Sequence, residues 1–180
     1  MTLDEFYNLS KDECLVKIKA ECQSQAKQRL YFGAILALII IALMIFTWTR
    51  LDHVRNLRIL PFFQFSVICL AAVWEAVSNY RFLQWLDNLN APEHLLHWYE
   101  KTMNNNRNAY YLGMLGLICN VVDPYAFANH EWDWVWVDMT FVILMLAFMI
   151  YSYFKGDYLR YKTDRDEEII DRLHDLINMK

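Results

Sequence analysis

The feature that most constrains this sequence is a run of 20 residues without a charge, Leu30 to Thr49, bracketed by Arg29 and Arg50. A helix of that length is ~30 Å long, because each residue adds ~1.5 Å, and this matches the hydrocarbon thickness of a bilayer. Hydrophobic residues make up 57% of the chain, whereas soluble domains contain roughly 45–50%. The run therefore predicts a membrane-spanning helix.

Three further apolar segments extend this prediction to four spans, at about 30–49, 59–80, 107–122 and 134–154. The second and fourth segments each contain a single charge, Glu75 and Asp138. The third is short, and Arg107 at its start would have to snorkel toward the membrane surface. We therefore expect an all-α fold in which residues 30–154 form an integral membrane four-helix bundle.

The distribution of basic residues predicts the orientation of these spans, since lysine and arginine stay on the cytoplasmic side. With four spans and an inner N-terminus, 14 of the 17 basic residues fall inside. Without the third span the balance becomes eight inside against nine outside. We therefore expect both termini in the cytoplasm, and the small size favours a bacterial inner membrane. The three arginines of the loop from Arg50 to Arg58 do not fit this pattern.

Amphipathic segments flank the predicted spans, in residues 1–29, 91–103 and 155–180. Ser10 and Glu13 form a capping-box pattern that starts a helix, and we expect residues 91–103 to form a helix along the inner membrane surface. The two terminal helices carry apolar stripes that a solvated helix does not need. We therefore expect these stripes to pack together or to form a partner interface: Leu15, Ile18, Ile169, Ile170, Leu173, Leu176 and Ile177.

Small residues at helical spacing predict places where helix backbones come close. Gly33 with Ala37 forms one such pair, and Gly113, Gly116 and Asn120 share one face of the third segment. These faces can pack within one chain or between copies of the chain in a homo-oligomer.

Glu75 is the first candidate for chemistry, because an ionisable group inside a span costs roughly 2.5–3.5 kcal/mol or more and needs a partner or water. It shares a helix face with Gln64, and Arg81 near the interface is a possible counter-charge. One interpretation is a cation or proton relay. The other is a polar contact between helices.

Asp138 lies near the outer end of the fourth segment, beside an acidic loop that contains Asp123, Glu131 and Asp133. Acidic residues gathered at the outer entrance of a channel can attract cations. The alternative is that the loop is acidic only because external loops lack basic residues under the positive-inside rule.

Other classes of function lack the residues they need. The net charge of −4 includes no basic stripe, which excludes nucleic acid as a partner. His94 and His97, flanked by Glu93 and Glu100, are weak metal candidates because no further ligand follows at a useful spacing. No nucleophile and base stand in a catalytic pattern, so we expect no cofactor and favour a protein that is not an enzyme.

Two functions remain from this reading. The first is a membrane-anchored accessory, scaffold or regulatory subunit that acts through its cytoplasmic helices. The second is a small homo-oligomeric ion channel or pore, in which Glu75 and Asp138 line a polar path.

Overall fold

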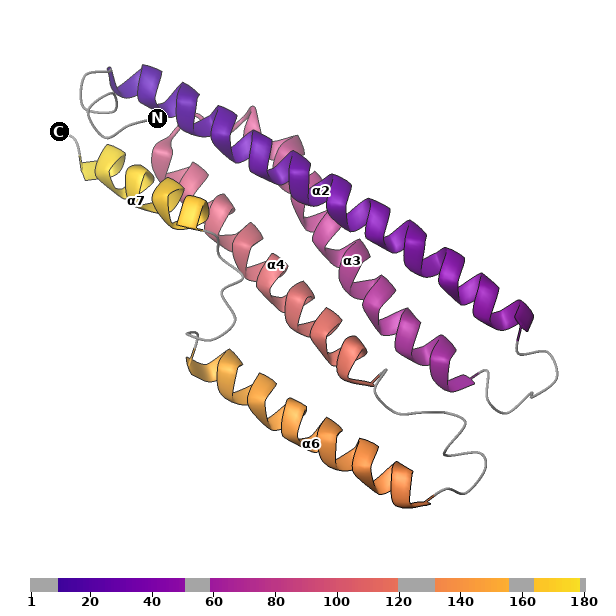
Figure 1. The fold of residues 1–180 in the computed structure, drawn as a ribbon. Helices are drawn as coiled ribbons and strands as arrows, with labels where there is room; N and C mark the ends of the chain where they lie inside the picture. The colour runs from indigo at the N-terminus through magenta and orange to yellow at the C-terminus, as the bar shows by residue number, and fades with distance from the viewer. Residues whose placement is uncertain (1–9, 51–58, 120–131, 156–163, 179–180) are drawn as a thin grey trace.

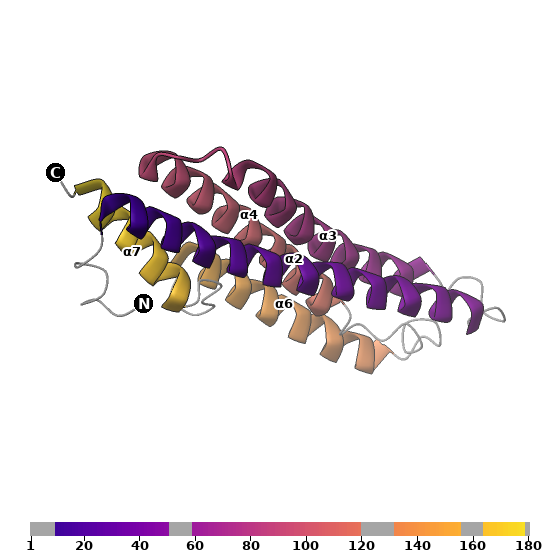
Figure 2. The same ribbon diagram turned by 90° about the horizontal axis from the view of Figure 1, so that it is seen from above.

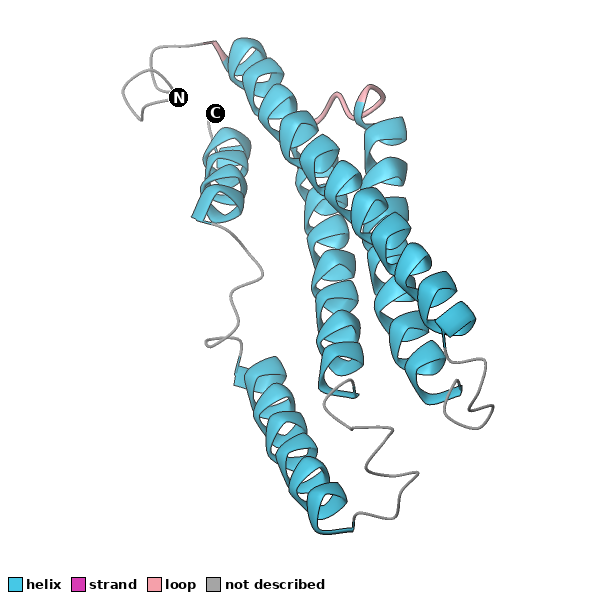
Figure 3. Ribbon diagram, turned by 45° about the vertical axis from the view of Figure 1, so that its right-hand side comes forward, coloured by secondary structure: helices cyan, strands magenta, loops and turns pink. Residues whose placement is uncertain are grey.

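A computed structural model of the chain describes residues 10–50, 59–119, 132–155 and 164–178. Within these residues the fold is all-α, as predicted, with five helices and no strand (Figures 1 and 3). The helices are α2 (Lys11–Arg50), α3 (Ile59–Leu86), α4 (Pro92–Cys119), α6 (Trp132–Lys155) and α7 (Asp164–Asn178).

The helices α2, α3, α4 and α6 alternate in direction, and α7 lies beside the starts of α2 and α4 (Figures 1 and 2). The start of α2, the turn between α3 and α4, and α7 therefore gather at one end of the molecule. We call this end the head and the remainder the body. The head comprises residues 11–29, 81–106 and 164–178, and the body comprises residues 30–50, 59–80, 107–119 and 132–155.

Local sequence explains how α2 begins and how far it reaches. The Ser10 amide and hydroxyl both donate to the Glu13 carboxylate, over 3.0 and 2.9 Å, and the Glu13 amide lies 3.4 Å from the Ser10 hydroxyl oxygen. This confirms the predicted capping box. From there α2 continues for 40 residues, a length of ~60 Å. The helix α2 therefore extends through both the head and the body.

The hydrophobic core lies in the head. Its members come from α2, α3, α4, α7 and the turn between α3 and α4, and they are Cys14, Ile18, Cys22, Ala26, Phe82, Leu86, Leu89, Leu95, Leu96, Tyr99, Met103, Ile169, Ile170, Leu173 and Leu176. In the body, by contrast, large apolar side chains face outward, such as Leu38 at 67% and Leu144 at 63% exposure.

Two of the described helices are long and apolar enough to cross a membrane, over Lys11–Phe46 of α2 and Phe62–Leu86 of α3. The apolar stretch Val135–Tyr151 of α6 is shorter, and the apolar half of α4 follows a polar half within the same helix. The four-span bundle is therefore not confirmed by the described helices.

The prediction of a separate surface helix over residues 91–103 is wrong. Those residues form the first half of α4, which continues without a break to Cys119. No glycine or proline interrupts the chain between Pro92 and Gly113, so nothing ends the helix. Leu95, Leu96 and Tyr99 are buried in the head core, and they cannot lie on a lipid surface.

The glycines of the body lie where α3 contacts its neighbours. A Cβ atom on Gly33 of α2 would lie 2.9 Å from the Ala72 carbonyl oxygen, and one on Gly116 of α4 would lie 2.6 Å from Ile68 Cγ1. Ala37 is also buried, whereas Asn120 lies outside the described residues. The predicted close approach of helix backbones thus occurs within one chain.

Candidate functional site

A buried ion pair ties three helices of the head together. Arg29 Nη2 of α2 lies 2.6 Å from Asp166 Oδ2 of α7, and the Tyr99 hydroxyl of α4 donates to Asp166 Oδ1 over 2.7 Å. The Asp166 side chain is fully buried, so its two oxygens are satisfied from two different helices. We call Arg29, Tyr99 and Asp166 the latch.

Burial sets the protonation states around the latch. It raises the pKa of the Tyr99 hydroxyl, and the Asp166 charge raises it further, so Tyr99 stays a neutral donor. Burial also raises the pKa of the nearby Cys22 thiol to about 12. Since the thiolate is the reactive form of cysteine, Cys22 acts as a small apolar side chain at neutral pH.

A second ionic contact joins α7 to α2. Arg172 Nη1 lies 3.2 Å from Glu21 Oε2, and Arg172 also pairs with Glu168 one turn earlier on α7. Arg172 is buried. Sequence reasoning missed both this contact and the latch, because no local pattern links residues so far apart in the chain. Arg172 lies 151 residues after Glu21, and Asp166 lies 137 residues after Arg29 and 67 after Tyr99.

The apolar stripes of the terminal helices are covered by the chain itself. Ile18, Ile169, Leu173 and Leu176 have no exposed surface, and Ile170 is buried. Leu15 and Ile177 are partly buried against the same core. In the structure the two stripes belong to one core, and these buried residues therefore leave no apolar face of this kind for a partner.

Polar side chains of the body make contacts between helices. Gln64 of α3 donates to the Cys119 carbonyl oxygen of α4, and Asn79 Nδ2 of α3 donates to Asn106 Oδ1 of α4 over 3.0 Å. Asn79 and Asn106 are both buried. The sequence analysis did not single out this asparagine pair, although the run Asn104–Asn106 next to an apolar segment was the signal that could have found it.

The two acidic residues predicted to lie in spans are half-buried on different helices. Glu75 is on α3. Arg81, the counter-charge expected from sequence, is exposed and lines a pocket. Asp138 lies near the start of α6.

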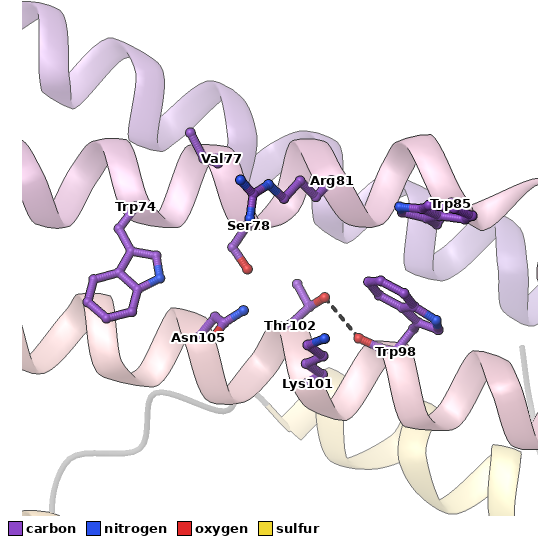
Figure 4. Close-up of a pocket in the computed structure, with 9 residues that line it drawn as sticks. All are labelled: Trp74, Val77, Ser78, Arg81, Trp85, Trp98, Lys101, Thr102 and Asn105. Carbon is purple, nitrogen blue, oxygen red and sulfur yellow. Dashed lines mark hydrogen bonds between the residues drawn. The ribbon is translucent and has the colours of Figure 1, made fainter.

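That pocket lies between α3 and α4 at the border of head and body, and Figure 4 shows its side chains. Its volume is ≈ 160 Å³. The Trp85 and Trp98 rings stack at 5.8 Å, and Lys101 Nζ lies 4.8 Å from the centre of the Trp98 ring. The lining residues are Trp74, Val77, Ser78, Arg81, Trp85, Trp98, Lys101, Thr102 and Asn105.

Metal binding has little support in the described part of the chain. No group of three histidine, cysteine, aspartate or glutamate side chains there is placed to hold an ion. His94 and His97 are exposed on α4, and Cys14 and Cys22 are buried in the head core.

Comparison of the chain with protein-family models, with curated proteins and with solved structures finds no match. The functional argument therefore depends on the residues and contacts described above.

Proposed function

We propose that this chain is a non-enzymatic, four-span membrane protein that holds a folded head outside the bilayer as a scaffold for a protein partner. The observation that carries the proposal is the latch. A buried pair of charges closes a hydrophobic core that the head segments of α2, α3, α4 and α7 share.

Placement in a membrane is supported by the outward-facing side chains of the body. On α2, Leu38 and Ile45 are 67% and 61% exposed, and on α6 Leu144 is 63% exposed. In water, exposed apolar area costs ~25 cal/mol per Å², and soluble proteins rarely leave large contiguous patches of it. Lipid removes this cost. α2, α3, the apolar half of α4 and α6 would then be the four spans.

Orientation follows from the basic residues at the border of head and body. Arg81 and Lys101 line the pocket at this border, and Arg29 is the last head residue of α2, paired with Asp166 of α7. Under the positive-inside rule the head and both termini would be cytoplasmic, and the inner membrane of a bacterium fits a chain of this size.

A scaffold explains why the head exists at all. A membrane anchor alone needs neither a core of fifteen buried residues nor a buried ion pair, whose desolvation is costly. Because the stripes of α2 and α7 are used inside the chain, a partner would bind the outer surface of the head. Val16 is 67% exposed on α2, next to Asp12, Glu13 and Lys17, and it offers an apolar contact within a charged surface.

The polar groups of the body favour the scaffold over the ion pore. Gln64 and Asn79 make hydrogen bonds to α4, so two polar side chains of α3 already serve helix packing.

A photo-crosslinking amino acid placed at Val16 tests the scaffold. In its own membrane, the Val16 variant should form an adduct of one defined mass, because a bound partner is held at a fixed site. Leu38, which is equally exposed on α2, is the matched control and should crosslink to lipid. Electrophoresis and mass spectrometry identify the adducts.

The Asp166→Ala change should abolish the Val16 adduct, since it opens the latch without touching the labelled surface. Asp171→Ala, an exposed position on the same helix, should preserve it. A Val16 variant that crosslinks to lipid alone, or an adduct that survives Asp166→Ala, would contradict the proposal.

A further inference from the structure

We propose that the pocket between α3 and α4 binds the phosphate group of an anionic membrane lipid. This inference rests on the membrane placement proposed above, and it assigns a ligand to a site that the scaffold function does not use. Three observations carry it: the charge of the pocket, an unsatisfied buried hydroxyl, and an apolar track that leads to it.

The pocket carries positive charge from two helices. Arg81 comes from α3 and Lys101 from α4, and no acidic residue is among the nine that line the pocket. Arginine and lysine side chains form strong, charge-assisted hydrogen bonds to phosphate oxygens. The Asn105 amide adds another polar group to the same wall (Figure 4). The pocket is thus complementary to a compact anion.

Ser78 supplies a donor that has no hydrogen-bond partner among the residues that the structure describes. Its side chain is only 8% exposed, and its hydroxyl oxygen is buried without a hydrogen bond. Figure 4 shows it pointing from α3 into the space between the helices, toward Asn105 and Thr102. Leaving a buried hydroxyl unpaired costs about 1–3 kcal/mol, whereas a ligand oxygen in the pocket would satisfy it.

The Thr102 hydroxyl does not compete for this role, because it donates to the Trp98 carbonyl oxygen over 2.9 Å. The same bond is drawn in Figure 4. The pocket therefore keeps one free buried hydroxyl, on Ser78, beside its two cations.

An apolar track on α3 leads from the body to the pocket. Leu70, Trp74, Val77 and Arg81 follow each other at spacings of four, three and four residues, which places them on one helix face. The first three are exposed. A lipid with its phosphate at Arg81 would lay an acyl chain along them, and the indole rings of Trp74, Trp85 and Trp98 suit the membrane–water interface.

Native mass spectrometry of the detergent-solubilised full chain tests the site, with phosphatidylglycerol, phosphatidylcholine and inorganic phosphate as probes. Wild type should bind one phosphatidylglycerol molecule in preference to phosphatidylcholine. Each basic residue near a membrane surface contributes a factor of about five in affinity. The double change Arg81→Gln and Lys101→Gln should therefore weaken phosphatidylglycerol binding about thirtyfold.

Two controls distinguish specific binding in the pocket from non-specific electrostatic attraction of the anionic lipid. Lys17→Gln with Lys27→Gln removes the same charge from exposed positions of α2 and should leave binding within twofold of wild type. Ser78→Ala keeps every charge, so it should weaken binding about threefold or more while the melting temperature without lipid stays equal or rises. Equal loss in both double variants, or unchanged binding in Ser78→Ala, would overturn the site.

The source of the phosphate is decided by the remaining probes. Inorganic phosphate should compete only weakly, and binding of inorganic phosphate without a preference for phosphatidylglycerol would overturn the lipid assignment. Vesicle flotation distinguishes a failure of the lipid site from a failure of the proposed membrane placement. A chain that does not float with vesicles contradicts the membrane placement, whereas one that floats but shows no lipid preference contradicts the lipid site alone.

Discussion

Replacing Asp166 with alanine is expected to lower the free energy of unfolding of the head by about 3–5 kcal/mol, the usual cost of removing one partner from a buried ion pair. Arg29 would keep its charge in a largely buried place without the carboxylate 2.6 Å away. The Tyr99 hydroxyl would lose the acceptor to which it donates. Thermal unfolding in detergent, followed by circular dichroism, measures the change.

The loss of stability in Asp166→Ala should be much larger than the loss caused by removing an exposed charge from the same helix. Asp171→Ala on the exposed side of α7 should change stability by less than about 0.5 kcal/mol. Tyr99→Phe removes the hydrogen bond that the Tyr99 hydroxyl donates to Asp166 Oδ1, and the loss of a buried hydrogen bond should cost about 1–3 kcal/mol. If Asp166→Ala and Asp171→Ala unfold at the same temperature, the latch does not hold the head together.

Alanine at Gly33 or Gly116 is expected to destabilise the body by roughly 1–3 kcal/mol through overpacking. At Gly33 the new Cβ would lie 2.9 Å from the Ala72 carbonyl oxygen and 3.2 Å from the Ala76 amide nitrogen, which are backbone atoms of α3. At Gly116 it would lie 2.6 Å from Ile68 Cγ1 and 3.1 Å from the Ile68 nitrogen. Either change forces α3 away from its neighbour.

Gly113→Ala is the matched control, because its Cβ would meet Ala71 Cβ at 3.5 Å, an ordinary van der Waals distance. Alanine favours a helix over glycine by about 1 kcal/mol, so this variant should be neutral or more stable. Unfolding in increasing concentrations of dodecyl sulfate compares the three variants. Equal stability of all three would show that the helices do not depend on these close approaches.

Local patterns were sufficient to predict an all-α fold, the start of α2 and the close contacts between helices. The uncharged run from Leu30 lies within α2, Ser10 and Glu13 begin that helix, and the glycines mark close helix contacts. Each of these predictions depends on residues that are near each other in the sequence, where helical spacing and capping act directly.

Predictions that needed contacts distant in sequence were incomplete. An amphipathic stripe indicates that a face is buried but not what covers it, so the stripe with Leu173 was also assigned to a partner although α2 and α4 cover it. Asp166 gives no local sign that it pairs with Arg29, 137 residues earlier. The predicted surface helix ended at residue 103, whereas α4 continues through Asn106, which is buried in a pair with Asn79 of α3.

The most direct test of the proposed four-span topology with a cytoplasmic head is to add one cysteine at a time and label the variants in intact cells with a membrane-impermeant maleimide. In a chain that lacks Cys69 and Cys119, the buried Cys14 and Cys22 can remain. Thr49→Cys and Asp133→Cys, at exposed positions near the outer ends of α2 and α6, should be labelled at once. Head positions should be labelled only after the cells are permeabilised: Ser24→Cys and Asn178→Cys. Protection of Asp133→Cys, or labelling of Ser24→Cys in intact cells, would contradict this topology.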